Sequence, residues 1–187
     1  SGRTLDLNSD DKMWITEGFA EYEPKDWVLP HALADVCNAV RVMRNALLGR
    51  DARDLEPWMQ GEPRRPDVYL HRRSLGGGLA TIAAAQLSGR MLGRPIVDRL
   101  ALEVPSLGAW RWRLHNSGTG LSARFGKVID AHPERHKLLI DRLRLMDAVI
   151  HGRKVRVPTL AMLAGRDEVA PAPSAAAVFN AIDADPG

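Results

Sequence analysis

The segment from Asp67 to Ala80 constrains the fold of this chain more than any other. It reads Asp-Val-Tyr-Leu-His-Arg-Arg-Ser-Leu-Gly-Gly-Gly-Leu-Ala, and an alanine-rich stretch follows it. Valine and tyrosine favour strands, whereas alanine favours helices. Glycine has no Cβ, so the three glycines at 76–78 permit a sharp turn and close packing. The segment therefore predicts a short strand over residues 68–70, a turn at Ser74 and a helix over residues 75–87.

The rest of the chain alternates between strand and helix patterns. Apolar residues at three- and four-residue steps predict a helix over residues 30–48. Further strands are predicted over 99–104 and 159–164, helical pieces over 113–149 with breaks near 118–120 and 132–133, and a helix over 175–182. Residues 1–28 show no clear period, and the polar, proline-containing residues 50–66 predict a surface connection. The order of elements predicts an α/β fold with a mostly parallel sheet.

Length and composition narrow the class of protein. The 187 residues suit one domain with a core of its own, so we expect a single domain over residues 1–187. A net charge of +3 without a long basic run does not predict nucleic-acid binding. No apolar stretch approaches the ~20 residues that a membrane helix needs, and the N-terminus lacks the apolar core of a signal peptide.

The cysteine and histidine residues also exclude some classes. The single cysteine, Cys37, excludes an internal disulfide and fits a reducing compartment; its apolar neighbours predict that it is buried. We therefore expect a cytoplasmic protein. No pair of the six histidines has the spacing of metal ligands, and we expect neither a metal nor another cofactor.

Two residues follow predicted strands where reactive groups gather. In parallel sheets such groups collect at the carboxyl ends of strands, and Ser74 and Asp167 each come after one. A serine between a strand and a helix is typical of a nucleophile elbow, in which the next backbone N–H, here that of Leu75, faces a developing negative oxygen. An acid such as Asp167 would orient a histidine that activates the serine. All six histidines precede Asp167, whereas the expected order places the histidine after it.

Each of these features has a simpler interpretation. Ser74 and the glycines can form an ordinary strand-to-helix turn. The glycines can suggest a phosphate cradle, although their spacing matches neither the dinucleotide fingerprint nor a Walker loop. Asp167 can be a solvated turn residue in its Gly-Arg-Asp-Glu loop. His71, on the strand before Ser74, is interpreted as a packing residue.

Several motifs together resemble the acetyl xylan esterase and cephalosporin C deacetylase family of α/β-hydrolases. The elbow is similar to that family's Gly-Gly-Ser-Gln-Gly-Gly-Gly-Leu-Ala, and Val104-Pro-Ser-Leu is similar to its Val-Pro-Phe-Leu. Leu145-Met-Asp-Ala148 resembles its Tyr-Phe-Asp-Ala, and Val178-Phe-Asn-Ala-Ile182 resembles its Tyr-Asn-x-Ile. The resemblance covers nearly all of the chain.

The resemblance implies a serine esterase that removes acetyl or other small acyl groups from sugars or related alcohols. Ser74 matches the nucleophile, Asp167 matches the triad acid, and the Leu75 N–H would form half of the oxyanion hole. The partners implied are a small-molecule acylated substrate and, in an oligomer, further copies of the chain. The implied fold is the α/β-hydrolase fold with helices on both faces of the sheet, incomplete at both ends. The family's Arg-Gly-Gln-Gly loop would lie before Ser1 and its histidine after Gly187.

Two departures from the family leave other functions open. Arg72 and Arg73 stand where the family has small residues before the nucleophile, and we expect Arg72 to strain or reshape the elbow. The histidine is missing from the chain. The alternatives are a non-catalytic α/β-hydrolase-like module used for binding or assembly, and a peptidase or thioesterase on the same fold.

Overall fold

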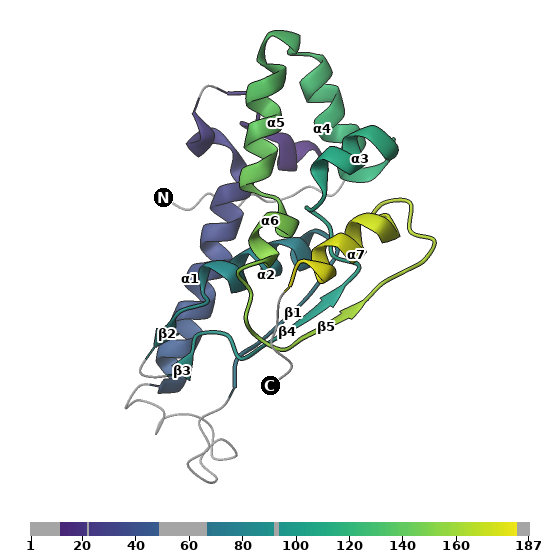
Figure 1. The fold of residues 1–187 in the computed structure, drawn as a ribbon. Coiled ribbons are helices and arrows are strands. Elements are labelled where there is room, and N and C mark those ends of the chain that lie inside the picture. Colours follow the sequence, from purple (N-terminus) through teal and green to yellow (C-terminus); the bar gives the residue numbers. More distant parts are fainter. Residues whose placement is uncertain (1–11, 22, 49–66, 92–93, 183–187) are drawn as a thin grey trace.

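The computed structural model of this chain describes residues 12–21, 23–48, 67–91 and 94–182 (Figure 1). The predicted surface connection at 50–66 lies outside them. The strands are β1 (Tyr69–Arg73), β2 (Arg90–Met91), β3 (Arg94–Pro95), β4 (Arg99–Glu103) and β5 (Thr159–Met162). The α-helices are α1 (Val28–Leu48), α2 (Leu75–Gln86), α3 (Trp110–Asn116), α4 (Gly120–Asp130), α5 (His136–Leu145), α6 (Ala148–Gly152) and α7 (Ala172–Asn180). Three short 3-10 helices are η1 (Lys12–Thr16), η2 (Pro24–Asp26) and η5 (Pro133–Arg135).

The predicted α/β architecture with a parallel sheet is confirmed. β1, β4 and β5 pair in parallel in the order β1-β4-β5, with Leu70 opposite Leu100 and Leu102 opposite Ala161. β2 and β3 form a separate antiparallel pair. Because all three strands of the larger sheet run the same way, the residues that follow β1, β4 and β5 meet at one edge of it.

The expectation of helices on both faces of the sheet is wrong for the part of the chain that the structure describes. Helix α2 packs against β1 and β4, α1 and α6 pack on α2, and α7 packs on α6, so the helices gather on one side (Figure 1). On the other side, Tyr69, Leu160 and Met162 are 58%, 74% and 57% exposed. The side chains in β4 alternate accordingly, with Leu100 and Leu102 buried toward the helices.

His71 lies on the exposed face, and its interpretation as a packing residue is wrong. Its side chain is 62% exposed, and its Nε2 atom lies 2.7 Å from Oε1 of Glu103 on the neighbouring strand. Position 71 has the same side-chain direction as Tyr69, because side chains two residues apart in a strand point to the same face.

Residues 12–27, which show no period in the sequence, contribute aromatic side chains to the core. Phe19 and Trp27 are fully buried and contact Phe125 of α4 at ring-centroid distances of 4.8 and 5.8 Å. The Trp27 indole N–H donates a 2.8 Å hydrogen bond to the Ile15 carbonyl. These contacts join the N-terminal segment to the helices beside the sheet, and they depend on individual aromatic residues rather than on a repeating pattern.

Cys37 is buried, as predicted, and burial raises the pKa of its thiol above the usual value. Among the described helices, none has the length and apolar character needed to cross a membrane. The described part of the chain also contains no group of three or more histidine, cysteine, aspartate or glutamate residues able to hold a metal ion.

Candidate active site

Ser74 occupies a strained turn between β1 and α2. Its backbone has φ 51° and ψ −122°, a conformation that residues with a Cβ rarely adopt. Hydrogen bonds on both sides hold it there: the Ser74 N–H donates to the Glu103 carbonyl at 2.8 Å, and the Ser74 carbonyl accepts from Gly78 and Ser106 at 3.2 and 3.0 Å. The strained turn predicted for a nucleophile elbow is therefore present at Ser74.

The glycines after Ser74 allow α2 to approach the loop that follows β4. A Cβ added to Gly78 would lie 2.0 Å from the Ser106 carbonyl oxygen, which is a direct clash. A Cβ on Gly77 would lie 3.1 Å from Cα of Pro105. Both glycines are buried. The glycine run thus serves close packing at the carboxyl ends of β1 and β4.

Arg72 fits into the elbow because Gly76 leaves room for it. A Cβ added to Gly76 would lie 3.3 Å from the Arg72 Cβ, closer than ordinary van der Waals contact. The Arg72 side chain is exposed, and its guanidinium donates to the His71 carbonyl at 2.9 Å. The elbow therefore tolerates an arginine two positions before the serine, with its long side chain directed to solvent rather than into the turn.

Ser74 opens onto a pocket of about 290 Å³. The Ser74 hydroxyl makes no capping hydrogen bond to α2, so it is not used to complete the helix. The first N–H groups of a helix have no acceptor within it, and Leu75 is the first residue of α2. The residues that line the pocket are Trp14, Ile15, Ser74, Leu75, Ser106, Gly120, Leu121, Arg124 and Val169.

Asp167 lies in the loop after β5 and does not itself line the pocket. Its Oδ1 atom accepts hydrogen bonds from the Val169 and Ala170 N–H groups at 2.9 and 2.8 Å, which folds the loop into a tight turn. Val169 lines the same pocket as Ser74. β1 and β5 flank β4, so the two strands are roughly 10 Å apart. The structure thus brings Ser74, Leu75 and the Asp167 loop to the same edge of the sheet.

Backbone strain is concentrated around this pocket. In the part of the chain that the structure describes, the non-glycine residues with positive φ are Ser74, Val104, Leu107 and Ala109. Three of them lie in the loop that follows β4, beside the elbow. Strained backbone of this kind persists where the surroundings over-determine it, and it clusters at functional sites.

Ser106 is a pocket residue that the sequence reasoning missed. It is 2% exposed, and its hydroxyl oxygen is buried without a hydrogen-bond partner. The signal was its position just past the carboxyl end of β4, in Val104-Pro-Ser, where a parallel sheet gathers reactive groups. Arg124 of α4 and Trp14 of η1 were also missed; neither follows a strand, so only the packing of the helices brings them to the pocket.

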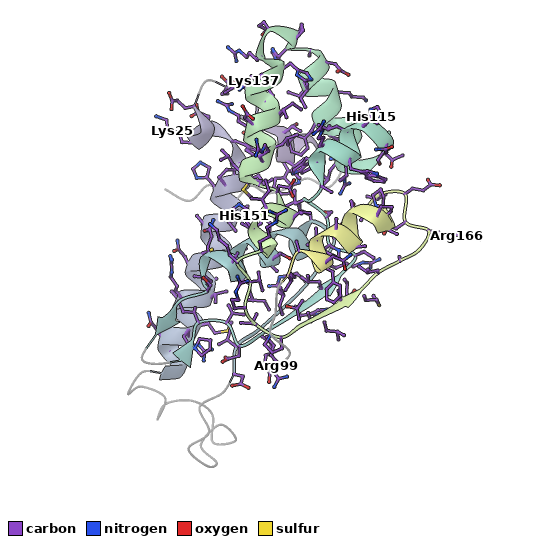
Figure 2. The ribbon with its side chains drawn as sticks, in the orientation of Figure 1. Lys25, Arg99, His115, Lys137, His151 and Arg166 are labelled. Carbon is purple, nitrogen blue, oxygen red and sulfur yellow. The ribbon has the colours of Figure 1, made fainter. Side chains whose placement is uncertain are left out.

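None of the six histidines, all of which lie in described segments, lines the pocket. His71 pairs with Glu103, and His151 lies 2.9 Å from the Leu145 carbonyl oxygen. Figure 2 shows His115 on α3 and His151 on α6, both away from the strands. The pocket therefore has a candidate nucleophile and a candidate acid nearby, but no imidazole from this chain between them.

Two solved structures of known proteins have a similar fold. One is the acetyl xylan esterase from Paenibacillus sp. R4, with a TM-score of 0.69 and 18% identity over 91% of this chain and 48% of that protein. The other is acetyl xylan esterase 1 from Thermoanaerobacterium sp. JW/SL YS485, with a TM-score of 0.65 and 18% identity over 99% of this chain and 51% of that protein. No protein-family model matches the sequence, and no curated protein matches it.

The chain thus shares the fold of these esterases and spans about half the length of each. At 18% identity the likeness concerns the backbone arrangement, which is compatible with an α/β-hydrolase fold that here has a three-stranded parallel sheet. The chemistry must be argued from the pocket itself.

Proposed function

We propose that this protein is a serine carboxylic-ester hydrolase that removes acetyl or other small acyl groups from sugars or related alcohols. The observation that carries the proposal is the strained conformation of Ser74, which holds a serine with no capping role at the rim of a pocket. A residue with φ 51° costs free energy that an ordinary turn would avoid by using glycine. The fold shared with two acetyl xylan esterases supports the same reaction.

In the proposed reaction, the Ser74 oxygen attacks the ester carbonyl and forms a tetrahedral intermediate. The Leu75 N–H, at the start of α2, donates to the developing oxyanion. Collapse of the intermediate releases the alcohol and leaves an acyl-serine, which water then hydrolyses to the free acid. Asp167 would orient and stabilise the protonated base that takes the serine proton.

The proposal requires a general base that the described pocket wall does not supply, because none of the six histidines lines the pocket. Without a base the hydroxyl is a weak nucleophile, and turnover falls by several orders of magnitude because the triad acts as a unit.

The size and lining of the pocket support a small acyl group. Its volume of about 290 Å³ is at the lower end of the range for small-molecule sites. Ile15, Leu121 and Val169 provide apolar walls, whereas Ser106 and Arg124 provide polar atoms. An acetyl group with part of an alcohol fits such a space better than a long fatty acyl chain.

A fluorophosphonate probe tests the proposal, because it reacts covalently with activated serine nucleophiles. When the base is present, we expect labelling of the protein that is lost in Ser74→Ala and retained in Ser88→Ala, an exposed serine just after α2. Hydrolysis of p-nitrophenyl acetate should exceed that of the octanoate ester. Labelling that survives in Ser74→Ala contradicts the assignment of the nucleophile, and preference for a thioester or a peptide identifies the thioesterase or peptidase alternative.

A second candidate function is a non-catalytic binding or assembly module with the same fold. The absence of histidine from the pocket favours it. It predicts that the folded protein is not labelled by the probe at any pH, while small acylated alcohols still shift its melting temperature. Labelling at Ser74 excludes this candidate.

A further inference from the structure

Arg113 of α3 is a fully buried cation beside the candidate active site. Its side chain has no exposed surface, and its Nη2 donates a 2.8 Å hydrogen bond to the Val169 carbonyl. Its Nε donates to the Ser122 hydroxyl at 3.2 Å, and its guanidinium lies 5.6 Å from the centre of the Trp110 ring. Val169 in turn lines the pocket that contains Ser74. Arg113 thus links the core of the helical region to the pocket through one carbonyl group.

The loop that carries Asp167 is held by other contacts from the same helices. The Thr119 hydroxyl donates to the Glu168 carbonyl. Gly120, at the start of α4, has φ 56°, and a Cβ there would lie 2.9 Å from the Val169 carbonyl oxygen. The loop from Asp167 to Ala170 therefore sits tightly against the junction of α3 and α4, and Arg113 occupies the buried side of that contact.

The charge on Arg113 has Asp167 as its electrostatic partner. No carboxylate of the described residues lies within ion-pair distance of Arg113, and its Nη1 is buried without a hydrogen bond. Burial lowers the pKa of Arg113 to about 10, while the negative charge of Asp167 acts in the opposite direction.

We propose that Arg113 is a positioning residue of the candidate active site. It holds the Asp167 loop against the Ser74 pocket through its hydrogen bond to the Val169 carbonyl. The functional meaning of this arrangement rests on the proposed function, in which Asp167 orients a base. The arrangement itself does not depend on it.

Other charges near Asp167 are less suited to this role. Arg166 and Glu168 flank it in the loop and are both exposed, and Figure 2 shows Arg166 at the outer tip of that loop. Water and salt screen such charges strongly. Arg124 lines the pocket from α4 but is only half-buried. Arg113 is the buried cation among these groups, and it donates directly to the backbone of the loop.

The test follows the Asp167 carboxyl group by its ¹³C NMR chemical shift at a fixed pH. In Arg113→Met we expect this chemical shift to change, because the loop loses the hydrogen bond to the Val169 carbonyl. Arg113→Lys, which keeps a hydrogen-bond donor, should retain most of the wild-type chemical shift. Arg111→Met makes the same change at an exposed position of the same helix and should leave Asp167 unchanged.

A second measurement reports on the position of the loop. The Val169 and Ala170 amides donate to Asp167, so we expect their hydrogen exchange to become at least several-fold faster in Arg113→Met, with exchange in β4 unchanged. If Arg113→Met does not fold, Ser122→Ala removes the Nε acceptor alone and should accelerate the same two amides to a smaller extent.

The outcomes separate this inference from the proposed function. An unchanged Asp167 chemical shift together with unchanged Val169 and Ala170 exchange overturns the role of Arg113, whether or not Ser74 is labelled. If Asp167 responds in Arg113→Met but wild-type Ser74 is never labelled, Arg113 positions the loop and the esterase proposal fails. If Ser74 is labelled, Arg113→Met should slow labelling more than Arg113→Lys does, while circular dichroism stays the same.

Discussion

At the scale of single residues, the candidate site depends on where a Cβ atom is present and where it is absent. Ser74 keeps a side chain in a backbone conformation that suits glycine, whereas Gly78 lacks one where the Ser106 carbonyl needs the space. The first case provides a hydroxyl at the rim of a pocket. The second allows the helix that follows to pack against the loop after β4.

Gly78→Ala is expected to lower the free energy of unfolding by about 3 kcal/mol, because its Cβ would meet a backbone oxygen that cannot move away easily. Gly126→Ala is the matched control: it also lies inside a helix, but no neighbouring atom comes within 4 Å of the added Cβ. The free energy of unfolding of Gly126→Ala should rise by about 0.5–1 kcal/mol. Urea unfolding measures both, and equal effects would show that α2 does not approach the loop as described.

The turn at Ser74 could be read from sequence at this scale, but the residues packed around it could not. Ser74 and the glycines stand together in the chain, so their spacing alone predicted the strained turn. Arg113 and Ser106 could not be assigned in the same way. Arginine is usually an exposed residue, and only the packing of α3 against α4 and the Asp167 loop buries this one.

At the scale of elements, the Asp147 carboxylate fixes the start of α3, the helix that carries Arg113. Asp147 is buried; its side chain accepts from the Val149 N–H at 2.9 Å, which caps α6. It also accepts from the Ala109 and Trp110 N–H groups at 3.2 and 3.3 Å, at the start of α3. A single side chain therefore satisfies backbone donors at the beginnings of two helices, which fixes where α3 begins relative to α6.

Asp147→Ala should lower the free energy of unfolding by about 2 kcal/mol, since it removes a helix cap and leaves buried N–H groups without acceptors. Asp141→Ala provides the comparison. Asp141 is exposed and pairs with Lys137 at 3.1 Å, a contact whose loss should cost less than about 0.5 kcal/mol. Thermal unfolding of the two variants tests the difference, and a similar small loss in both would contradict the capping role of Asp147.

The elements themselves were predictable where glycine, proline and apolar spacing acted together. The helix predicted over 30–48 begins two residues earlier and ends at Leu48, and the breaks near 118–120 and 132–133 separate α3, α4 and α5 as expected. The β2–β3 pair was missed, because strands of two residues leave no period to detect. The 3-10 helices η1 and η2 were missed because five and three residues are also too few to show a repeating pattern.

At the scale of the whole molecule, the sheet is covered on one side only in the described chain. The sequence indicates this one-sided cover, because Arg99-Leu-Ala-Leu-Glu103 alternates polar and apolar residues. Such alternation is typical of a strand with one solvent-exposed face. The alternation of strands and helices along the chain, together with the family resemblance, favoured helices on both faces. The alternation of polar and apolar residues within β4 was the better guide.

Two leucines on opposite faces of the sheet test this arrangement. Leu160→Thr, at a 74% exposed position of β5, should change the free energy of unfolding by less than about 0.5 kcal/mol. Leu102→Ala, at a 2% exposed position of β4, should cost about 2–5 kcal/mol. Chemical denaturation of both variants gives the answer. A large loss in Leu160→Thr would mean that something covers this face in solution.

The hydrogen bonds around Ser74 have a further consequence for how the protein unfolds. The Glu103 carbonyl belongs to β4, and the Ser106 N–H belongs to the loop that follows it. Hydrogen bonds from the middle strand and its loop therefore hold the turn at Ser74, which follows the neighbouring strand β1. We therefore expect the turn at Ser74 to unfold together with the sheet. On heating, the loss of Ser74 labelling and the unfolding of the sheet should follow one curve, with no folded form that has already lost labelling.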